Sequence, residues 1–390
     1  MVGYFYQVRV ALLVALKRLR TDEQFLIGLE TIDDIAITGE SGSPIQILQI
    51  KHHRSRTGDL SDLSPDLWKT LRVWSEGIRE GAIENNCLCM LMTTGTAPVE
   101  SAAYYLKNEK RNPERAWELL CLAMQRSTSS SLEPSFTAFQ FLGAKRQKEL
   151  LENIYIQDAN PDITNIEPLL RQEIYLAVRP EQQSPFLERL EGWWYQKAVA
   201  CLSANPPSTI SNLDIQLKIN QLRDQFGPDS LPIDEDLFSQ TITEGPPYTD
   251  MLFVEQLKVI PAHRHIVHAI KDYYRAFTQR SRWMKDQLIF PQDLDMYETK
   301  LREAWDLRFI QMRDKLGDEP SDEFMRQEAL EILNWCETHS HVPIRRNCNE
   351  RFVAVGTYHI LANNLHVGWH HQFKERLVHL LECPQPDASV

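Results

Sequence analysis

The chain has 390 residues, with 42 Lys and Arg residues against 54 Asp and Glu residues, which gives a formal net charge of −12. With 43% hydrophobic and 25% charged residues its composition is that of a globular protein, not of a mostly disordered chain. Domains of about 100–200 residues predict two or three of them here. The acidity argues against a protein that coats nucleic acid with its whole surface, although a local basic patch remains compatible with it.

The N-terminus and the apolar segments predict a cytoplasmic protein. No window reaches the run of about 18 apolar residues that a membrane span needs. The apolar stretch 10–16 is followed by Lys17, Arg18 and Arg20, whereas a signal peptide has its basic residues first. The seven cysteines include no C-x-x-C pair, so we expect reduced thiols and find no support for a zinc ribbon.

The first 98 residues predict a helix, three strands, a helix and a further strand. Periodicity is the main signal, supported by a possible N-cap at Ser64, a first-turn Pro65 and a Gly- and Pro-rich connection at 39–44. In chain order the predicted elements are a helix at 4–20, strands at 25–29, 32–37 and 45–50, a helix at 64–83 and a strand at 87–92.

Beyond residue 98 the pattern is mostly helical. Helices are predicted at 102–105, 113–125, 136–151, 166–176, 186–202 and through most of 251–381. The segment 227–249 is rich in Pro, Gly and acidic residues, which is typical of a linker. The sequence therefore predicts a first domain at 1–226 (a core of 1–98 and a helical extension of 99–226), a linker at 227–249 and a helical assembly or regulatory domain at 250–390.

Charged and polar side chains follow two of the predicted strands. Residues two apart in a strand share a face, so Gln49 and Lys51 point the same way. The same alternation favours Asp34 over Asp33 as the acid that faces them, and Glu30 has the parity of Asp34. A lysine on an apolar strand needs a reason, because burying its charge is costly.

This set of residue types suits metal-assisted hydrolysis of a phosphodiester. We expect Asp34 and Glu30, the Gln49 side-chain oxygen and the Ile50 carbonyl to bind Mg²⁺ or Mn²⁺, because hard cations prefer oxygen ligands. Lys51 would orient or deprotonate the attacking water and offset charge at phosphorus. Asp33 is assigned a supporting role. A basic edge for the DNA backbone follows directly along the chain at His52, His53, Arg54 and Arg56.

The pattern Gln-x-Lys, with acids on the strand before it, predicts an α/β (α+β) restriction-endonuclease-like fold, the PD-(D/E)xK class, followed by a mostly α-helical C-terminal domain. The predicted element order agrees with that core. The alternative is an ordinary hairpin, in which Lys51 only extends its charge to solvent and Asp33 and Asp34 decorate a turn.

Several segments resemble bacterial defence proteins. Gly-Tyr-Phe-Tyr-Gln at 3–7, Leu-Glu-Thr-Ile-Asp-Asp-Ile at 29–35 and Leu-Gln-Ile-Lys-His at 48–52 resemble the double-stranded DNA endonuclease domain found in some CBASS effectors and in ABC-three-component systems. The C-terminal part resembles the latter systems, at 253–257, 279–283, 342–345, 356–363 and 367–370. Residues from about 100 to 240 contribute little to the resemblance.

The resemblance implies the nuclease effector of a Lamassu system, of the LmuA or DdmA type. Such effectors are held inactive in a complex with an SMC-like ATPase and a small third subunit. On release they self-associate and cut double-stranded DNA without sequence preference. The family motif carries Glu30, Asp34, Gln49 and Lys51 over as active-site residues, and Gln7 as a helix residue that supports the site.

Two other groups of residues, the C-terminal Arg and Trp residues and the C-terminal histidines, allow less specific interpretations. Arg280, Trp283, Arg345 and Trp369 are predicted to form a partner interface, since Arg and Trp are common interface anchors. A C-terminal group of histidines, including His359, His366, His370 and His371, is interpreted as packing or interface rather than as a zinc site, because the spacing is poor for ligands and no cysteine accompanies it.

Two other functions remain open at this point. One is a non-catalytic adaptor whose nuclease-like fold only binds a partner. The other is a CBASS-type nuclease controlled by a cyclic nucleotide, although residues 251–381 show few strand patterns and no Gly-rich phosphate loop.

Overall fold

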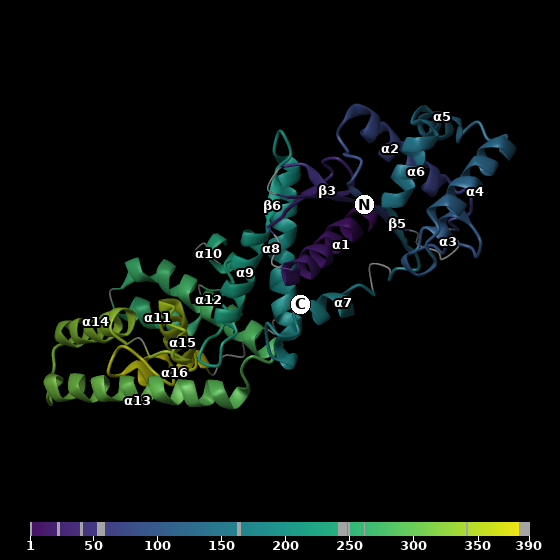
Figure 1. Ribbon diagram of the computed structural model, residues 1–390. Coiled ribbons are helices and arrows are strands. Elements are labelled where there is room, and N and C mark those ends of the chain that lie inside the picture. Colours follow the sequence, from purple (N-terminus) through teal and green to yellow (C-terminus); the bar gives the residue numbers. More distant parts are fainter. Residues whose placement is uncertain are drawn as a thin grey trace. The chain divides into compact units, whose positions relative to one another are not determined.

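A computed structural model describes the chain apart from residues 1, 22–23, 40–41, 53–58, 162–164, 241–247, 249, 261, 341 and 382–390. The chain forms two compact units, residues 1–222 and 223–390, and each is considered by itself (Figure 1). Within the described residues, no helix combines the length and apolar character needed to cross a membrane.

The first unit contains the predicted series of helix, three strands, helix and strand. Its elements are α1 (Val2–Arg18), β1 (Leu26–Leu29), β2 (Ile35–Thr38), β3 (Pro44–Lys51), α2 (Pro65–Glu80), β4 (Leu88–Thr93), α3 (Ala102–Tyr105), α4 (Pro113–Arg126), α5 (Glu133–Phe141), α6 (Gly143–Asn153), β5 (Ile154–Gln157), α7 (Glu167–Glu173), α8 (Gln183–Ser203), β6 (Thr209–Ser211) and α9 (Asn212–Gln225), with short 3-10 turns at Leu19–Thr21, Asn108–Lys110 and Pro180–Gln182.

These strands form one mixed sheet in the order β5-β4-β3-β2-β1-β6. The pairs β1–β2, β2–β3 and β1–β6 are antiparallel, whereas β3–β4 and β4–β5 are parallel. The sequence did not predict β5 or β6. Both are very short, and β5 follows α6 without a break, so neither interrupts the helical pattern enough to be recognised.

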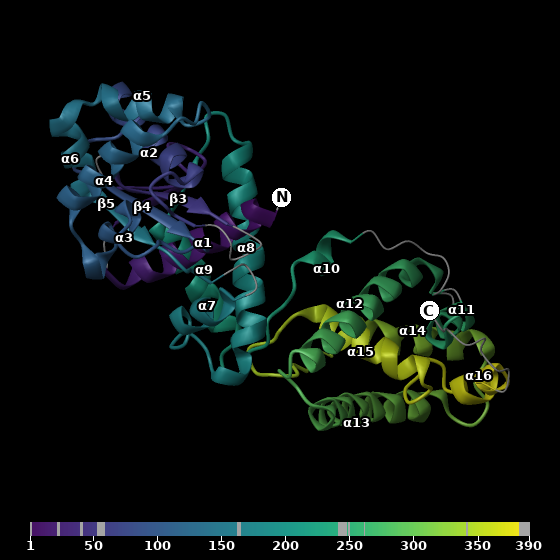
Figure 2. The same ribbon diagram turned by 90° about the vertical axis from the view of Figure 1, so that its right-hand side faces the viewer.

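Helices cover both faces of the sheet. On one face, Trp68 and Trp74 of α2 are fully buried with Phe139 of α5 against Ile47 of β3. On the other, α1 contacts β1, and Figure 2 shows α1 and α2 on opposite sides of the strands. Pro65 opens α2 as predicted, although the Ser64 side chain makes no capping hydrogen bond. Near the C-terminal end of β3, between these helical layers, the polar residues Asp33, Gln49 and Thr93 are buried.

The second unit is helical throughout its described part. Its elements are α10 (Asp236–Ser239), α11 (Leu252–Val259), a 3-10 turn (His263–His265), α12 (Ile266–Lys285), α13 (Pro291–Leu316), α14 (Asp322–Thr338), α15 (Arg351–Asn363) and α16 (Phe373–Leu381). Helices α12 and α15 pack most closely. Gly356 permits this, because a β-carbon there would overlap the carbonyl oxygen of Asp272.

Part of the predicted linker belongs to this helical unit, which corrects the expectation of a spacer at 227–249. Leu231 and Leu237 are buried, and Trp283 donates its indole N–H to the Pro232 carbonyl at 2.7 Å. We call residues 228–240 the strap. The prediction was wrong because a Pro- and acid-rich segment that packs on a helix has the same composition as a linker that packs on nothing. Residues 241–247 and 249 of the predicted linker lie outside the described residues.

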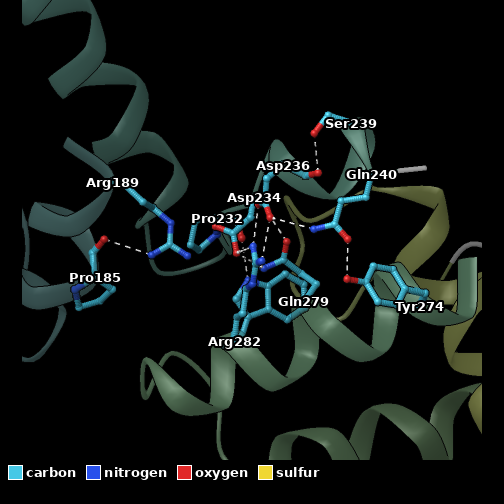
Figure 3. Close-up of polar contacts among 11 residues, drawn as sticks. Pro185, Arg189, Pro232, Asp234, Asp236, Ser239, Gln240, Tyr274, Gln279 and Arg282 are labelled. Atoms are coloured by element: carbon cyan, nitrogen blue, oxygen red, sulfur yellow. Dashed lines mark hydrogen bonds and ion pairs between the residues drawn. The ribbon is translucent and has the colours of Figure 1, made fainter. Parts of the chain in front are cut away.

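Polar contacts hold the strap against α12 (Figure 3). Arg282 donates two hydrogen bonds to the Asp236 carboxylate, at 2.7 and 2.8 Å, and a third to Asp234 at 3.2 Å. These contacts raise the pKa of the Arg282 guanidinium, with the hydrogen bond to Asp236 as the largest cause. Gln279 exchanges hydrogen bonds with Asp234 through the Asp234 backbone N–H and carboxylate, at 2.9 and 3.1 Å.

Three of the four predicted interface residues are instead core residues. Trp283 and Trp369 are fully buried, so a partner could not reach their rings. Arg280 is also buried, where it pairs with Glu298. The fourth, Arg345, keeps about a third of its side chain exposed and forms an ion pair with Asp293 at 3.2 Å, so its role at an interface stays a prediction. Arg and Trp anchor cores as well as interfaces, and sequence alone did not separate the two.

Candidate functional site

The candidate site lies where β2 and β3 part. Their pairing reaches Ile35 opposite Leu48, and β3 then continues through Gln49 to Lys51. Along this extension β3 pairs on one side with β4, Gln49 opposite Leu91 and Lys51 opposite Thr93. The turn at residues 30–34, which joins β1 to β2, approaches the other side. A turn rich in acids therefore meets a strand end that carries an amide and an ammonium group.

Asp34 is fixed to β3 by two hydrogen bonds to one carboxylate oxygen. The Ile50 backbone N–H donates to Oδ2 at 2.6 Å, and the Gln49 side-chain amide donates to the same oxygen at 2.5 Å. The prediction that Asp34, rather than Asp33, faces Gln49 is confirmed. Gln49 is itself buried, and both contacts fall on Oδ2 of Asp34, so neither of them uses Oδ1.

Asp33 points into the helical layer on α2. Its carboxylate accepts hydrogen bonds from Trp74 Nε1 at 2.6 Å and from the Asp34 N–H at 2.9 Å. Burial raises the pKa of Asp33 to about 7, despite the lowering effect of those hydrogen bonds. Asp33 therefore ties the turn to α2, a position that is compatible with the supporting role predicted for it. The two adjacent aspartates thus have different environments.

Glu30 opens the turn in a left-handed conformation, with φ of 50°, and its N–H donates to the Asp34 carbonyl at 3.1 Å. Partial burial raises the pKa of Glu30, the Asp34 carboxylate raises it further, and Lys51 lowers it. The structure thus brings Glu30, Asp34 and Lys51 within mutual electrostatic range. Backbone strain alone does not mark the site, since other non-glycine residues of the described chain also have positive φ.

The donor atoms suit a hard divalent cation. Two carboxylates that repel each other, an amide oxygen and a main-chain carbonyl are all oxygen ligands of the kind that Mg²⁺ and Mn²⁺ take. The raised pKa of Glu30 beside Asp34 is what a cation between them would relieve. Within the described ranges, no group of three or more His, Cys, Asp or Glu side chains is arranged to hold a metal, so the site depends on the amide and carbonyl oxygens.

The predicted basic edge is only partly described. His53, Arg54 and Arg56 lie outside the described residues. His52 follows Lys51 and packs its ring against Tyr6 of α1, with centroids 4.7 Å apart. Its Nε2 is buried and makes no hydrogen bond to the described part of the chain. His52 is thus turned toward α1, and a phosphate contact through Nε2 would need this packing to change.

The start of α1 contributes aromatic residues to which the sequence assigned no role at the site. Tyr6 donates its hydroxyl to the Pro161 carbonyl at 2.8 Å. Tyr4 has a raised pKa, through partial burial and then through the Glu30 carboxylate. Gln7 is half-buried on the same helix. The two tyrosines within the segment 3–7 were the available signal, but the direction of their side chains depends on how α1 packs.

The C-terminal histidines are largely packing residues, as interpreted. His359 is fully buried between the rings of Phe253 and Trp369, at 5.5 and 5.9 Å, and burial lowers its pKa to about 3. The pKa of His370 is lowered to about 4, again mainly by burial. Both imidazoles are therefore neutral near pH 7.

The helical unit can be compared with known families. Residues 253–377 match the family model described as C-terminal domain 7 of the ABC-three component (ABC-3C) systems. This part of the chain is similar to an ABC-3C C-terminal domain. This match supports membership of that defence-system family, as the resemblance of the C-terminal segments predicts. It does not extend to the sheet of the first unit. No curated protein and no solved structure matched the chain.

The ABC-3C domain match starts at α11 and includes α12 through most of α16. The strap, at 228–240, precedes the matched range yet packs on α12 within the same unit. The folded unit that contains the ABC-3C domain is therefore longer than the matched range at its N-terminal side.

Proposed function

We propose that this ABC-3C protein is a metal-dependent endonuclease that cuts double-stranded DNA without strong sequence preference. The observation that carries the proposal is the Asp34 carboxylate, held by the Gln49 amide and the Ile50 N–H beside Lys51 and Glu30. Acid, amide and ammonium groups meet at the C-terminal end of β3. The adaptor reading gives no reason for this convergence.

The first unit is proposed to be a restriction-endonuclease-like core. Three antiparallel strands, a helix on one face and a fourth strand parallel to β3 agree with that arrangement. In this proposal the Gln49-x-Lys51 pair on β3 and Asp34 before β2 would correspond to the positions where this class carries its chemistry. The extra strands β5 and β6 extend the sheet at its two edges and leave this arrangement unchanged.

Each residue has a distinct proposed role. Glu30, Asp34, the Gln49 side-chain oxygen and the Ile50 carbonyl would hold Mg²⁺ or Mn²⁺. When bound, such an ion polarises the phosphate and lowers the pKa of a coordinated water. The Ile50 N–H and the Gln49 amide orient Asp34, so that its free oxygen is presented in one direction. Lys51 orients the attacking water, takes or shares its proton, and offsets the negative charge that grows on the phosphate.

The helical unit is proposed to serve assembly. ABC-3C systems have several components, and the predicted partners are an SMC-like ATPase and a small third subunit. A complex of this kind would hold the nuclease inactive, and release followed by self-association would activate it. Self-association would be needed for a double-strand break, because one site cuts one strand and two sites must therefore lie close together.

The test compares Lys51→Ala and Asp34→Ala with the wild type, each as the self-associated full-length protein with Mg²⁺ and linear duplex DNA. Removing a group that stabilises the transition state should lower the cleavage rate by about 100-fold or more. Lys69→Ala, at an exposed lysine of α2, is the matched control and should cut like the wild type.

Two results would reject the proposal. Full cleavage by Lys51→Ala would show that this is not the active site. Inactive wild-type protein in every assembly state, together with intact defence in a Lys51→Ala strain, would favour the non-catalytic adaptor.

A further inference from the structure

Two exposed aromatic rings stack on each other beside the candidate site. Phe5 of α1 and Tyr195 of α8 have centroids 5.8 Å apart and planes inclined by 21°. Their side chains are 40% and 42% exposed, so both rings keep a large area open to solvent. We call Phe5 and Tyr195 the ring pair. Single exposed aromatics are common, but a stacked pair left open on two packed helices presents a flat apolar surface.

The helices that carry the ring pair are firmly joined. Arg9 of α1 forms an ion pair with Glu191 of α8 at 2.6 Å. Trp194, next to Tyr195, is buried and donates its indole N–H to the Val8 carbonyl at 2.8 Å. The ring pair is therefore held in place by its neighbours and does not itself need to be exposed for the helices to pack. The ring pair therefore presents a fixed apolar surface to solvent, on which a flat ligand could stack.

The ring pair also adjoins the candidate site. Tyr4 precedes Phe5 along α1, and its pKa is raised by partial burial and by both the Glu30 carboxylate and Tyr195. Tyr6, on the other side of Phe5, packs on His52 at the end of β3. The first turns of α1 thus run from the end of the Lys51 strand to the ring pair. The neighbours of Phe5 on both sides are therefore linked to the site, Tyr6 through His52 and Tyr4 through Glu30.

We propose that the ring pair stacks an unpaired base of the DNA strand that lies in the site. This inference rests on the proposed nuclease function and refines its substrate, to DNA with frayed ends, gaps or single-stranded stretches. Every base has a π-face, so such stacking tolerates any sequence, whereas a closed duplex hides those faces. Residues 1–98 carry 10 Lys and Arg against 12 Asp and Glu, a net charge of −2, so electrostatic attraction alone gives little hold on DNA.

The test reads stacking directly, without cleavage. Full-length Lys51→Ala protein, which should not degrade the probe, is titrated into a single-stranded oligonucleotide containing 2-aminopurine, whose fluorescence falls when the base stacks. We expect quenching that disappears in the Phe5→Ala/Tyr195→Ala double variant, with binding at least about fivefold weaker. Tyr195→Phe keeps the ring and should keep the quenching. Phe141→Ala removes a 73% exposed aromatic ring of α5 and serves as the matched control.

The outcomes separate this inference from the nuclease proposal. Unchanged quenching in the double variant would overturn the ring pair as a base platform. So would a double variant that alters the oligomeric mass but not the quenching, since the rings would then be an interface between copies. Ring-dependent quenching by a protein that never cuts DNA would support the platform while rejecting the nuclease. Cleavage by the wild type with ring-dependent preference for frayed over closed ends supports both.

Discussion

Asp33 accepts a hydrogen bond from the indole N–H of Trp74 at 2.6 Å, while the next residue, Asp34, is bound to β3. The single contact between Asp33 and Trp74 ties the acidic turn to helix α2. Because Asp33 is buried, losing this partner would leave a polar group without its donor. The turn that presents Asp34 therefore depends on a residue about 40 positions away in the chain.

A double-mutant cycle measures this coupling. Trp74→Phe removes the donor and keeps an aromatic ring, and Asp33→Ala removes the accepting carboxylate. Each single variant should lower the free energy of unfolding, by about 1–3 kcal/mol, and the double variant should lose less than the sum. Chemical denaturation of the metal-free protein gives the three values. Strict additivity would mean that the two side chains do not stabilise each other.

The sequence predicted those parts of the site that follow from local geometry. Strand alternation alone placed Asp34 toward Gln49, because side chains two apart always share a face. The partner of Asp33 could not be predicted, since any of several tryptophans could have met the turn. The same limit explains Tyr4, whose position near Glu30 depends on how α1 docks on the sheet.

The predictions of a linker at 227–249 and of an interface role for Trp283 were wrong, because both depended on residue type and not on tertiary packing. The strap has the proline and acidic content of a linker, yet Leu231 and Leu237 are buried. Trp283 has the residue type of an interface anchor, yet it lies in the core and binds the Pro232 carbonyl. Both errors concern the same contact between the strap and α12. An apolar residue every few positions within the acidic segment was the signal that could have prevented them.

The strap predicts where the helical unit can be cut. A fragment of residues 223–390 should unfold cooperatively, whereas a fragment of 250–390, which begins just before the family match, should be less stable or molten. Without the strap, Trp283 loses its hydrogen bond to the Pro232 carbonyl, and its hydrophobic cluster loses Leu231. Thermal unfolding followed by near-UV circular dichroism distinguishes the two fragments. Equal melting temperatures would contradict a structural role for the strap.

A milder change tests the ionic part of the strap contact in the full chain. Arg282→Ala removes the bidentate pair with Asp236 and the bond to Asp234, and should cost about 1–2 kcal/mol. Arg264→Ala is a matched control, because Arg264 is exposed in the turn before α12. Hydrogen exchange of the strap amides should rise in the first variant and stay unchanged in the second.

His359 predicts a stabilising substitution. Neither of its ring nitrogens has a hydrogen-bond partner among the described residues, although the side chain is fully buried. Replacing such a group with an apolar one of similar size removes a desolvation cost, so His359→Leu should raise the free energy of unfolding by about 1 kcal/mol or more at pH 7.5. His366→Leu, at an exposed position just beyond the end of α15, should have little effect.

The pH dependence of His359 has a defined sign. Its pKa is about 3 in the folded chain and about 6.5 when unfolded, so acid favours the unfolded state. Wild-type stability should therefore fall relative to His359→Leu as the pH drops below 6.5, by about 2 kcal/mol between pH 7.5 and 5. A constant difference between the two proteins across this range would show that His359 keeps an ordinary pKa.

The last prediction concerns Glu30 and the ion it is proposed to share with Asp34. Burial raises the pKa of Glu30, and repulsion by the Asp34 carboxylate raises it further. A divalent cation between the two carboxylates would attract both of them. Glu30→Gln keeps an oxygen but loses the charge, so we expect Mn²⁺ binding to the full-length protein to weaken by about tenfold or more, as measured by calorimetry. Glu80→Gln, at an exposed position at the end of α2, should bind Mn²⁺ like the wild type. Equal affinity in all three proteins would place any metal elsewhere, and would leave Glu30 as a neighbour of the site instead of a ligand in it.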